Sequence, residues 1–458
     1  MEKQQFVPNK MGVQPVGALV LKMSLPMMVS MLVQALYNIV DSMFVARISE
    51  NALTAVSLAF PYQLLVISVA VGTGVGVNSL AARLLGEKKQ AEANYAAAHG
   101  QLLALVTGLI FGLLFALFTP QLIGVFKPEE EIYQYACTYM YWVGVPSLFV
   151  ISQCMFERIL QATGDTLHSM MAQLSGAIFN LIFDPILIFG LLGFPRLGVA
   201  GAAIATVGGQ ILGMSLAVFF LHKKNDLIDV SMKGFKPDAT VIKEIYRVGM
   251  PSIVMQAIGS VTNFGMNKIL IAFTPTAVSV LGVYFKLQSF VFMPVFGLSS
   301  GTMPIMGYNY GARDKARVMS ALKHACLYAL IIMCLGTALF QIFAEELLML
   351  FDASDYMLEI GVPALRIISV CFPSAALGIV FSTLFQAIGN GKLSLFVSAC
   401  RQLVVILPVA YLLANTYGLH ATWLAYPIAE GIALAISALL LVQTIRNNIA
   451  TLEDGPVQ

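Results

Sequence analysis

The sequence has few charged residues. Charged side chains make up 11% of its 458 residues, whereas hydrophobic side chains make up 58%. A soluble domain contains about 25% charged and about 45–50% apolar residues, so this composition argues against a water-soluble protein. The formal net charge is only +2, and the basic residues gather in short loops between apolar runs. We therefore expect no nucleic-acid partner.

Motifs for metal binding, redox chemistry and catalysis are missing as well. The six cysteines show no CxxC spacing, and no histidine stands beside them at a zinc-binding distance along the chain. Gly72, Gly74 and Gly76 lie inside an apolar run without a preceding strand, which indicates close helix packing or a bend and not a nucleotide-binding loop. No nucleophile or acid–histidine pair suggests catalysis. We predict neither an enzyme nor a cofactor.

What the sequence does have is long apolar segments. Runs of about 20 residues, the length needed to cross the hydrocarbon core of a bilayer, recur from end to end. They predict an all-α integral membrane protein with twelve transmembrane helices, in which the first helix is retained. The predicted spans are 18–46, 53–80, 95–118, 132–160, 168–192, 198–221, 248–272, 279–306, 321–344, 361–387, 393–414 and 419–444.

The distribution of lysine and arginine predicts the orientation. Nearly all of them fall in loops on one side of this layout, and only Arg47, Lys127 and Arg196 fall on the other side. Positively charged loops remain in the cytoplasm. We therefore expect a multi-pass protein with both termini cytoplasmic.

The two halves of the chain repeat one another. Three matches share an offset of 225: Pro26 with Pro251 (251 − 26), Gly86 with Gly311 (311 − 86) and Gln161 with Gln386 (386 − 161). Each half holds an even number of spans, so the repeat is parallel and its axis follows the membrane normal. The predicted domains are an N-lobe at 1–221, a cytoplasmic connecting loop at 222–247, a C-lobe at 248–445 and a cytoplasmic tail at 446–458, each lobe with six helices.

Acidic residues in the first half are the strongest candidates for function. A carboxylate at bilayer depth costs roughly 2.5–3.5 kcal/mol, so such residues usually mark a working site. Asp41 lies on a polar face of the first span, and Asn180 and Asp184 are four residues apart on one side of the fifth. Thr206 in the sixth span can complete an oxygen-rich cluster. We interpret Asp41 and Asp184 as a site for H⁺ or Na⁺.

Two other interpretations of these acids stay open. Local hydrogen bonds or a basic residue can neutralise them, and Asp184, directly before Pro185, can serve only to cap a kinked helix. Glu430 in the last span is a candidate second protonation site, or else a structural partner of Arg401. Glu157 and Arg158 lie near the cytoplasmic end of the fourth span, where snorkelling or a structural ion pair is expected.

Several segments together resemble the multidrug and toxic compound extrusion (MATE) transporters, in order along nearly the whole chain. They are Ser24-Leu-Pro26, Asp41-Ser-Met-Phe-Val45, Gly86-Glu-Lys-Lys89, Gln161-Ala-Thr-Gly-Asp165, Asn180 with Asp184-Pro-Ile-Leu-Ile-Phe-Gly190, and Gly198-Val-Ala-Gly-Ala-Ala-Ile-Ala-Thr206.

The resemblance implies two six-helix lobes in a bacterial cytoplasmic membrane and export of cationic or amphipathic drugs in exchange for H⁺ or Na⁺. It also implies a cation site at Asp41, Asn180, Asp184 and Thr206, which are all present. Some relatives carry a second acidic site in the seventh and tenth spans. The seventh span here has Gln256, Asn263 and Asn267 but no acid, so we expect coupling in the N-lobe alone.

For the substrate, we expect contacts from the polar face of the first span and from two neighbouring helices. The candidates are Met31, Gln34, Tyr37, Gln153 and Asn180. In the working mechanism, cation binding reshapes the first span near its kink at Pro26, with a second kink at Pro185. The partners are then drugs and membrane lipid, and an internally duplicated chain needs no second subunit. The rival hypothesis is a flippase for lipids or lipid-linked oligosaccharides.

Overall fold

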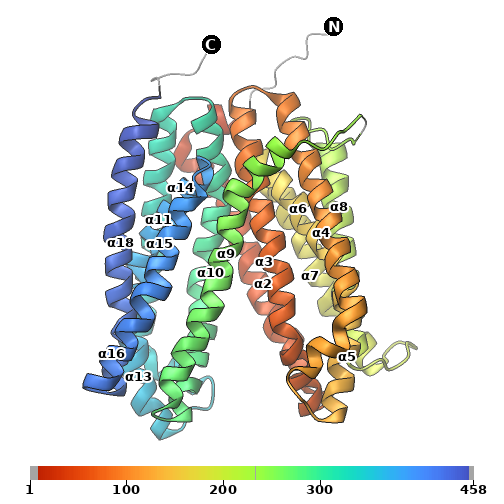
Figure 1. Ribbon diagram of the computed structural model, residues 1–458, viewed down its shortest axis with the longest axis vertical. Coiled ribbons are helices and arrows are strands. Elements are labelled where there is room, and N and C mark those ends of the chain that lie inside the picture. Colours follow the sequence, from red (N-terminus) through yellow and green to blue (C-terminus); the bar gives the residue numbers. More distant parts are fainter. Residues whose placement is uncertain (1–8, 233, 453–458) are drawn as a thin grey trace. The chain divides into compact units, whose positions relative to one another are not determined.

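The computed structural model describes residues 9–232 and 234–452, which fold into helices and loops with no β-strand within these ranges (Figure 1). The chain forms two compact units. Of the described residues, the first unit holds Asn9 and Val29–Met250, and the second holds Lys10–Met28 and the chain from Pro251 onward. The predicted lobe boundaries at 221 and 248 lie inside α8 (Val199–Lys224) and α9 (Ala239–Ile271), so the segment between these two helices is shorter than the predicted loop at 222–247. The units divide inside α2 (Val16–Ala46) and α9.

The first unit contains most of α2, the start of α9 and all the helices between them. These are α3 (Glu50–Gly86), α4 (Gln90–Gly124), α5 (Glu130–Gly144), α6 (Ser147–Ala162), α7 (Thr166–Phe189) and α8 (Val199–Lys224). The predicted fourth span is two helices, α5 and α6, which meet at an angle of 44°. Pro146 lies at the break. Because proline has no backbone N–H, it cannot donate the hydrogen bond that would continue the helix.

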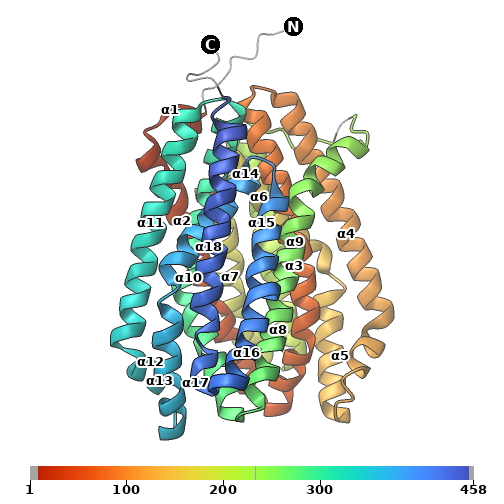
Figure 2. The ribbon, with the colours of Figure 1, turned by 60° about the vertical axis from the view of Figure 1, so that its left-hand side comes forward.

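The second unit has the same plan. Its main helices are α10 (Pro275–Gly311), α11 (Lys315–Ile342), α13 (Asp355–Ser369), α14 (Phe372–Ala387), α15 (Gly391–Ala399), α16 (Leu407–Tyr417) and α18 (Ala425–Thr444). Short helices complete it: α1 (Lys10–Val13), α12 (Ala344–Met349), α17 (Leu419–Thr422) and two π-helices, η1 (Cys400–Ile406) and η2 (Ile445–Ile449). α13 and α14 form a second bent pair, at 47°. In Figure 2, α1 and the last turns of α18 lie at the same end of this unit.

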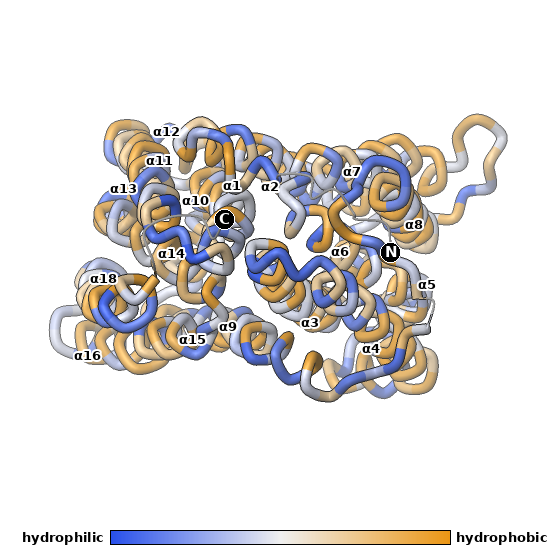
Figure 3. Tube along the Cα trace, turned by 90° about the horizontal axis from the view of Figure 1, so that it is seen from above, coloured by the Kyte–Doolittle hydropathy of each residue, from blue (hydrophilic) through white to orange (hydrophobic). Residues whose placement is uncertain are grey.

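The helices are those of a membrane protein. Nine are long and apolar enough to cross a bilayer, and the two bent pairs raise the number to eleven among the described residues. The one predicted span that is not among these eleven, 248–272, belongs to α9, a helix of 33 residues that carries several polar side chains. Figure 3 shows hydrophobic stretches along most helices. On α4, the side chains of Leu109, Leu113 and Leu117 are 56%, 61% and 58% exposed, as expected where lipid covers them.

Glycines of α3 and α10 explain why the units divide inside α2 and α9. In the second unit, a Cβ atom on Gly301 of α10 would lie 2.6 Å from the Cα atom of Ser24, at the start of α2. In the first unit, a Cβ atom on Gly76 of α3 would lie 2.2 Å from the carbonyl oxygen of Ile245, at the start of α9. Gly76 and Gly301 are 225 apart (301 − 76). The close packing expected at Gly72–Gly76 is therefore confirmed, and it recurs in the second unit.

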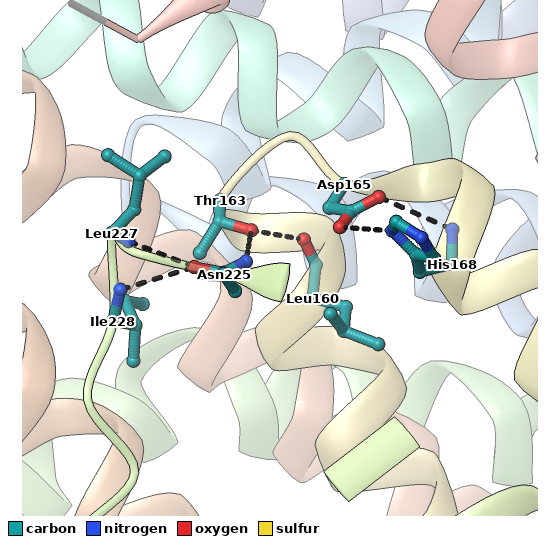
Figure 4. Close-up of polar contacts among 7 residues, drawn as sticks. All are labelled: Leu160, Thr163, Asp165, His168, Asn225, Leu227 and Ile228. Carbon is teal, nitrogen blue, oxygen red and sulfur yellow. Dashed lines mark hydrogen bonds and ion pairs between the residues drawn. The ribbon is translucent and has the colours of Figure 1, made fainter. Parts of the chain in front are cut away.

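Polar contacts fix the loop that follows α8. Asn225 donates from its amide to the Thr163 hydroxyl at 2.6 Å, and its carbonyl oxygen accepts from the backbone of Leu227 at 3.0 Å and Ile228 at 3.3 Å (Figure 4). Next to Thr163, the Asp165 carboxylate caps the first turn of α7 by accepting from the backbone of His168 at 3.3 Å. The loop is thus tied to the α6–α7 turn, which sets where α7 begins.

Candidate functional site

The densest polar cluster of the first unit surrounds Asn180 on α7. Its amide satisfies all its neighbours when the nitrogen donates to Oδ2 of Asp184 at 2.5 Å and the oxygen faces α8. The oxygen then accepts from the backbone nitrogen and the hydroxyl of Thr206, both at 3.0 Å, and from the Tyr37 hydroxyl at 3.3 Å. One amide therefore connects α2, α7 and α8.

Close packing of α7 against α8 makes this cluster possible. A Cβ atom on Gly209 of α8 would lie 2.5 Å from the carbonyl oxygen of Gly176 on α7, and one on Gly201 would lie 2.6 Å from the carbonyl oxygen of Leu187. Any larger residue at Gly201 or Gly209 would push the helices apart. The small residues thus bring Thr206 within hydrogen-bonding distance of α7.

Asp41 and Asp184 bring two carboxyl groups together. Asp184 is 1% exposed, and the two groups are close enough to share a hydrogen bond when one of them carries a proton. Each has a buried Oδ1 atom without a hydrogen-bond partner. Two negative charges this close and this buried repel one another, and a bound proton or cation relieves the repulsion.

The alternatives for these acids can now be compared with the structure. Among residues 9–232 and 234–452, neither Asp41 nor Asp184 forms an ion pair with a basic side chain. Asp184 caps no helix either, because α7 continues through Pro185 to Phe189. Local hydrogen bonding, by contrast, is present through Asn180. Pro26 likewise lies inside the continuous helix α2, and kinks at the two prolines stay predictions.

The predicted substrate residues lie on α2, α6 and α7. Tyr37 joins the acid cluster, and the Gln34 amide donates to Asn38 on the same helix at 3.3 Å. Met31 is partly buried on the same helix. Gln153 lies on α6, where its amide donates to Glu157 at 2.9 Å and adjoins the contact between α7 and α8.

Sequence reasoning missed Tyr139 of α5. Its side chain is 4% exposed, its hydroxyl accepts from Gln63 at 3.4 Å, and both Asp41 and Asp184 contribute to its electrostatic surroundings. α5 contains four tyrosines, so residue type alone could not single out this one.

For Glu157 and Arg158 the sequence left open snorkelling or a structural ion pair, and their burial favours a structural role. Both are only 9% exposed, because α6 packs against α3, α4 and α8 along its length. Glu157 accepts from Gln153 and lies near Arg158, whose guanidinium donates to Gln161 at 3.0 Å. These contacts are those of a structural polar network.

The second unit has a different polar centre. Nη1 of Arg401 in η1 donates to Oε1 of Glu430 in α18 at 3.0 Å, the pairing that the sequence analysis named as the alternative to a protonation site. In the internal repeat Asn180 and Asp184 fall opposite the apolar residues Leu403 and Leu407, at the offset of 223 that also relates Pro185 to Pro408 (408 − 185). No group of three or more His, Cys, Asp or Glu side chains suited to a metal ion occurs in the described part of the chain.

Comparisons with known proteins agree with this arrangement. The MatE family model matches residues 26–186 and again residues 251–412, and the two matches begin 225 residues apart (251 − 26). The multidrug export protein MepA of Staphylococcus haemolyticus is 28% identical, with 93% of each chain covered. An FAD transporter of Shewanella oneidensis is also 28% identical, covering 94% of this chain and 95% of its own.

A solved structure has the same fold. The outward-facing conformation of a multidrug resistance MATE family transporter of the MOP superfamily superimposes with a TM-score of 0.91 at 27% identity, over 97% of this chain and 99% of the other. This likeness covers both units, including the bent helix pairs and the helices that carry the two polar centres.

Proposed function

Because this chain belongs to the MatE family of transporters, we propose that it exports cationic or amphipathic drugs in exchange for H⁺ or Na⁺. Members of this family are multi-pass membrane transporters and not enzymes. The finer statement about drug and ion rests on one observation: the buried carboxyl group of Asp184 and the partly buried one of Asp41 meet without a basic partner among the described residues.

The chemistry of exchange follows from that observation. The carboxyl pair needs positive charge, which a proton, a sodium ion or the cationic group of a drug can supply. Oxygen atoms of Asp41, Asp184, Asn180 and Thr206 are hard ligands of the kind that Na⁺ prefers. If one occupant is displaced by another, loading of H⁺ or Na⁺ from outside releases the drug. The two conformations then shift by the difference in affinity of each ligand for each state.

Helix α2 connects this site to the rest of the fold. Tyr37 and Asp41 lie on its first-unit segment, whereas Ser24 lies on its second-unit segment and donates to the Leu298 carbonyl of α10 at 3.2 Å. Pro26 lies on α2 between Ser24 and Tyr37, close to the point where the two segments meet, and it removes one backbone hydrogen bond of the helix. We propose that cation binding at Asp41 changes α2 at Pro26, and that Met31, Gln34, Tyr37, Gln153 and Asn180 contact the drug.

The setting that we propose is a bacterial cytoplasmic membrane with both termini in the cytoplasm. The excess of lysine and arginine on one side supports this orientation. A monomer supplies both lobes, and the only bound species that the mechanism requires are the drug and the coupling ion.

Ethidium efflux from proteoliposomes tests the proposal, with pH and Na⁺ gradients imposed separately. We expect one gradient to drive efflux in the wild type and neither to drive it in Asp41→Asn or Asp184→Asn. Glu345→Gln, on the exposed start of α12, is the control that keeps efflux. Undiminished efflux in both aspartate variants would refute the coupling site. No efflux from the wild type under either gradient would instead favour the lipid flippase.

A further inference from the structure

Arg401 and Glu430 form the main polar contact between two spans of the second unit. Arg401 lies in η1, in the middle of the span made by α15, η1 and α16, and this span packs against α18 (Figures 1 and 2). A π-helix widens the backbone spiral and leaves one residue per turn out of the α-helical register, and such segments occur often at functional sites. Here it carries the only arginine of the span.

The guanidinium of Arg401 is not saturated by its partner. It makes one hydrogen bond, from Nη1 to Glu430, and no other partner is found for it among residues 9–232 and 234–452. A guanidinium has five N–H donors arranged to hold a carboxylate with two parallel bonds. The side chain is 26% exposed, against 13% for Glu430. Arg401 therefore has donors that Glu430 does not use, on a side chain that is partly exposed.

Two further buried donors lie at the start of α18. Tyr426 precedes Glu430 by four residues (430 − 426) on α18, so these two share one helix face, whereas Trp423 lies in the turn between α17 and α18. The indole N–H of Trp423, which is 0% exposed, and the hydroxyl of Tyr426, which is 9% exposed, lack hydrogen-bond partners in the described structure. Buried donors without partners are rare in folded proteins and call for an occupant.

Groups from three other segments complete the surroundings of Glu430. Tyr284 of α10 and the Cys371 thiol, at the α13–α14 bend, both interact electrostatically with it. Cys371 interacts with Arg401 and Tyr426 as well. Arg401 and Glu430 are thus the charged groups of this centre, and Glu430 is its acceptor. The centre offers donors without a matching oxygen ligand.

We propose that Arg401, Glu430 and Tyr426 form a second substrate site, which binds the carboxylate of an acidic or zwitterionic compound together with one proton. The incoming carboxylate takes the place of Glu430 on Arg401, and Glu430 takes up a proton. The number of charges inside the unit is then unchanged, which avoids the high cost of a net charge at bilayer depth. The site names a substrate class for the proposed exporter, and in this respect it rests on the proposed function.

Equilibrium dialysis with radiolabelled 3-phenylpropionate tests the site on the full-length protein in detergent. Its uncharged analogue 3-phenylpropanamide, used as a competitor, differs only in the charged group. We expect the carboxylate to bind, the amide not to compete, and the Kd to fall by up to about tenfold per pH unit between pH 8 and pH 6, since one proton is taken up with each ligand.

Two variants and one control separate this site from a merely structural ion pair. Glu430→Gln frees Arg401 permanently, so binding becomes tighter at pH 8 and independent of pH. The neutral pair Arg401→Gln/Glu430→Gln keeps the shape and hydrogen bonding but abolishes binding. Lys286→Gln, which removes another intramembrane cation of this unit, one that lies 5.8 Å from the centre of the Phe351 ring, leaves binding as in the wild type.

Tryptophan emission gives a local reading. The chain has two tryptophans, so Trp142→Phe leaves Trp423, in the turn directly before α18, as the one reporter of ligand binding. Absent binding in both wild type and Glu430→Gln, or equal binding in the neutral pair, would overturn the proposal. Ethidium efflux by the wild type is measured in parallel. Ethidium efflux without carboxylate binding would refute this site and leave the proposal of drug export standing. Carboxylate binding without ethidium efflux would support this site and refute drug export.

Discussion

The two units share their packing but differ in their polar chemistry. Gly76 and Gly301, 225 residues apart (301 − 76), hold the same kind of helix contact in each. At the polar centres, the first unit places two acids around one amide, whereas the second places one acid on an arginine. Helix contacts depend on the backbone and tolerate little change, while a buried polar group can change once its partners change with it. After duplication, therefore, the packing was kept and the chemistry diverged.

Replacement of Asn180 should have the largest effect on the polar centre of the first unit, which the second unit lacks. Asn180→Leu removes the donor to Asp184 and the acceptor for Thr206 and Tyr37, so buried polar groups lose their partners. We expect ethidium affinity, and its competition by H⁺ or Na⁺, to weaken by about 100-fold, which corresponds to ~3 kcal/mol. Equilibrium binding to purified protein measures this change.

The matched control lies opposite Asn180 in the second unit. Leu403→Ile, 223 residues after Asn180 (403 − 180), replaces an apolar residue with another and should leave ethidium binding within about twofold of the wild type. If both substitutions had the same effect, the functional difference between the units would be disproved.

Substitutions at the shared glycines test what the units have in common. Gly76→Val and Gly301→Val place side-chain atoms where backbone atoms of Ile245 and Ser24 lie. Each should destabilise the protein by about 1–3 kcal/mol or more, since neither backbone can yield easily. Thermal unfolding in detergent should show a lower Tm for both. Gly431→Ala, where no atom lies within 4 Å of the added Cβ, should leave Tm unchanged or raise it. A fall in only one unit would contradict equivalent packing.

Thr206→Val is a smaller change at the first centre. Valine keeps the shape of threonine but loses the hydroxyl that faces Asn180 at 3.0 Å. The loss of one hydrogen bond, about 0.5–1.5 kcal/mol, should lower the affinity for the competing H⁺ or Na⁺ by about 2–10-fold. Competition curves against ethidium give this affinity, and Thr206→Ser should keep most of the wild-type affinity. No rescue by serine would mean that the methyl group, not the hydroxyl, is what matters.

Tyr139→Phe should have the smallest effect. Its hydroxyl lies 3.4 Å from Gln63 and near both acids without a direct hydrogen bond to either among the contacts observed. We expect about a twofold change in ethidium affinity and an unchanged Tm. Tyr133→Phe, on the same helix but bonded to the Pro120 carbonyl at 3.3 Å, is the control. A tenfold effect at Tyr139 would make it a direct ligand.

Most of the fold could be predicted from the sequence. Span length and apolar composition gave α2, α3, α4, α7 and α8 within a few residues at most ends, because each crosses the bilayer as one helix. The bends at α5–α6 and α13–α14 were missed, although Pro146 and Pro373 stand at them. An apolar run has the same composition whether it is straight or bent, and a proline inside a membrane helix need not end it, as Pro185 shows.

The candidate site was predictable only in part. Asp41, Asn180 and Asp184 stand out because polar residues in apolar helices are costly and follow helical spacing. The environment of Tyr139, and the contacts of Gln153 with Glu157 and with the packed helices α7 and α8, depend on which faces of α5 and α6 turn inward. Helical periodicity gives no answer when apolar residues surround a helix on all sides.

The sequence by itself determined that this protein crosses a membrane many times, that its halves repeat and that acids lie within its first half. These properties depend on composition and spacing, which the free energy of transfer into lipid turns directly into structure. Only the tertiary structure decided which polar groups share a site: Asn180 with Asp184 and Thr206, and Arg401 with Glu430. These contacts between helices join successive spans, 26 residues apart for Asn180 and Thr206 (206 − 180) and 29 for Arg401 and Glu430 (430 − 401). In the first unit the distance is set by the glycine-mediated packing of α7 against α8, which cannot be read from either helix alone.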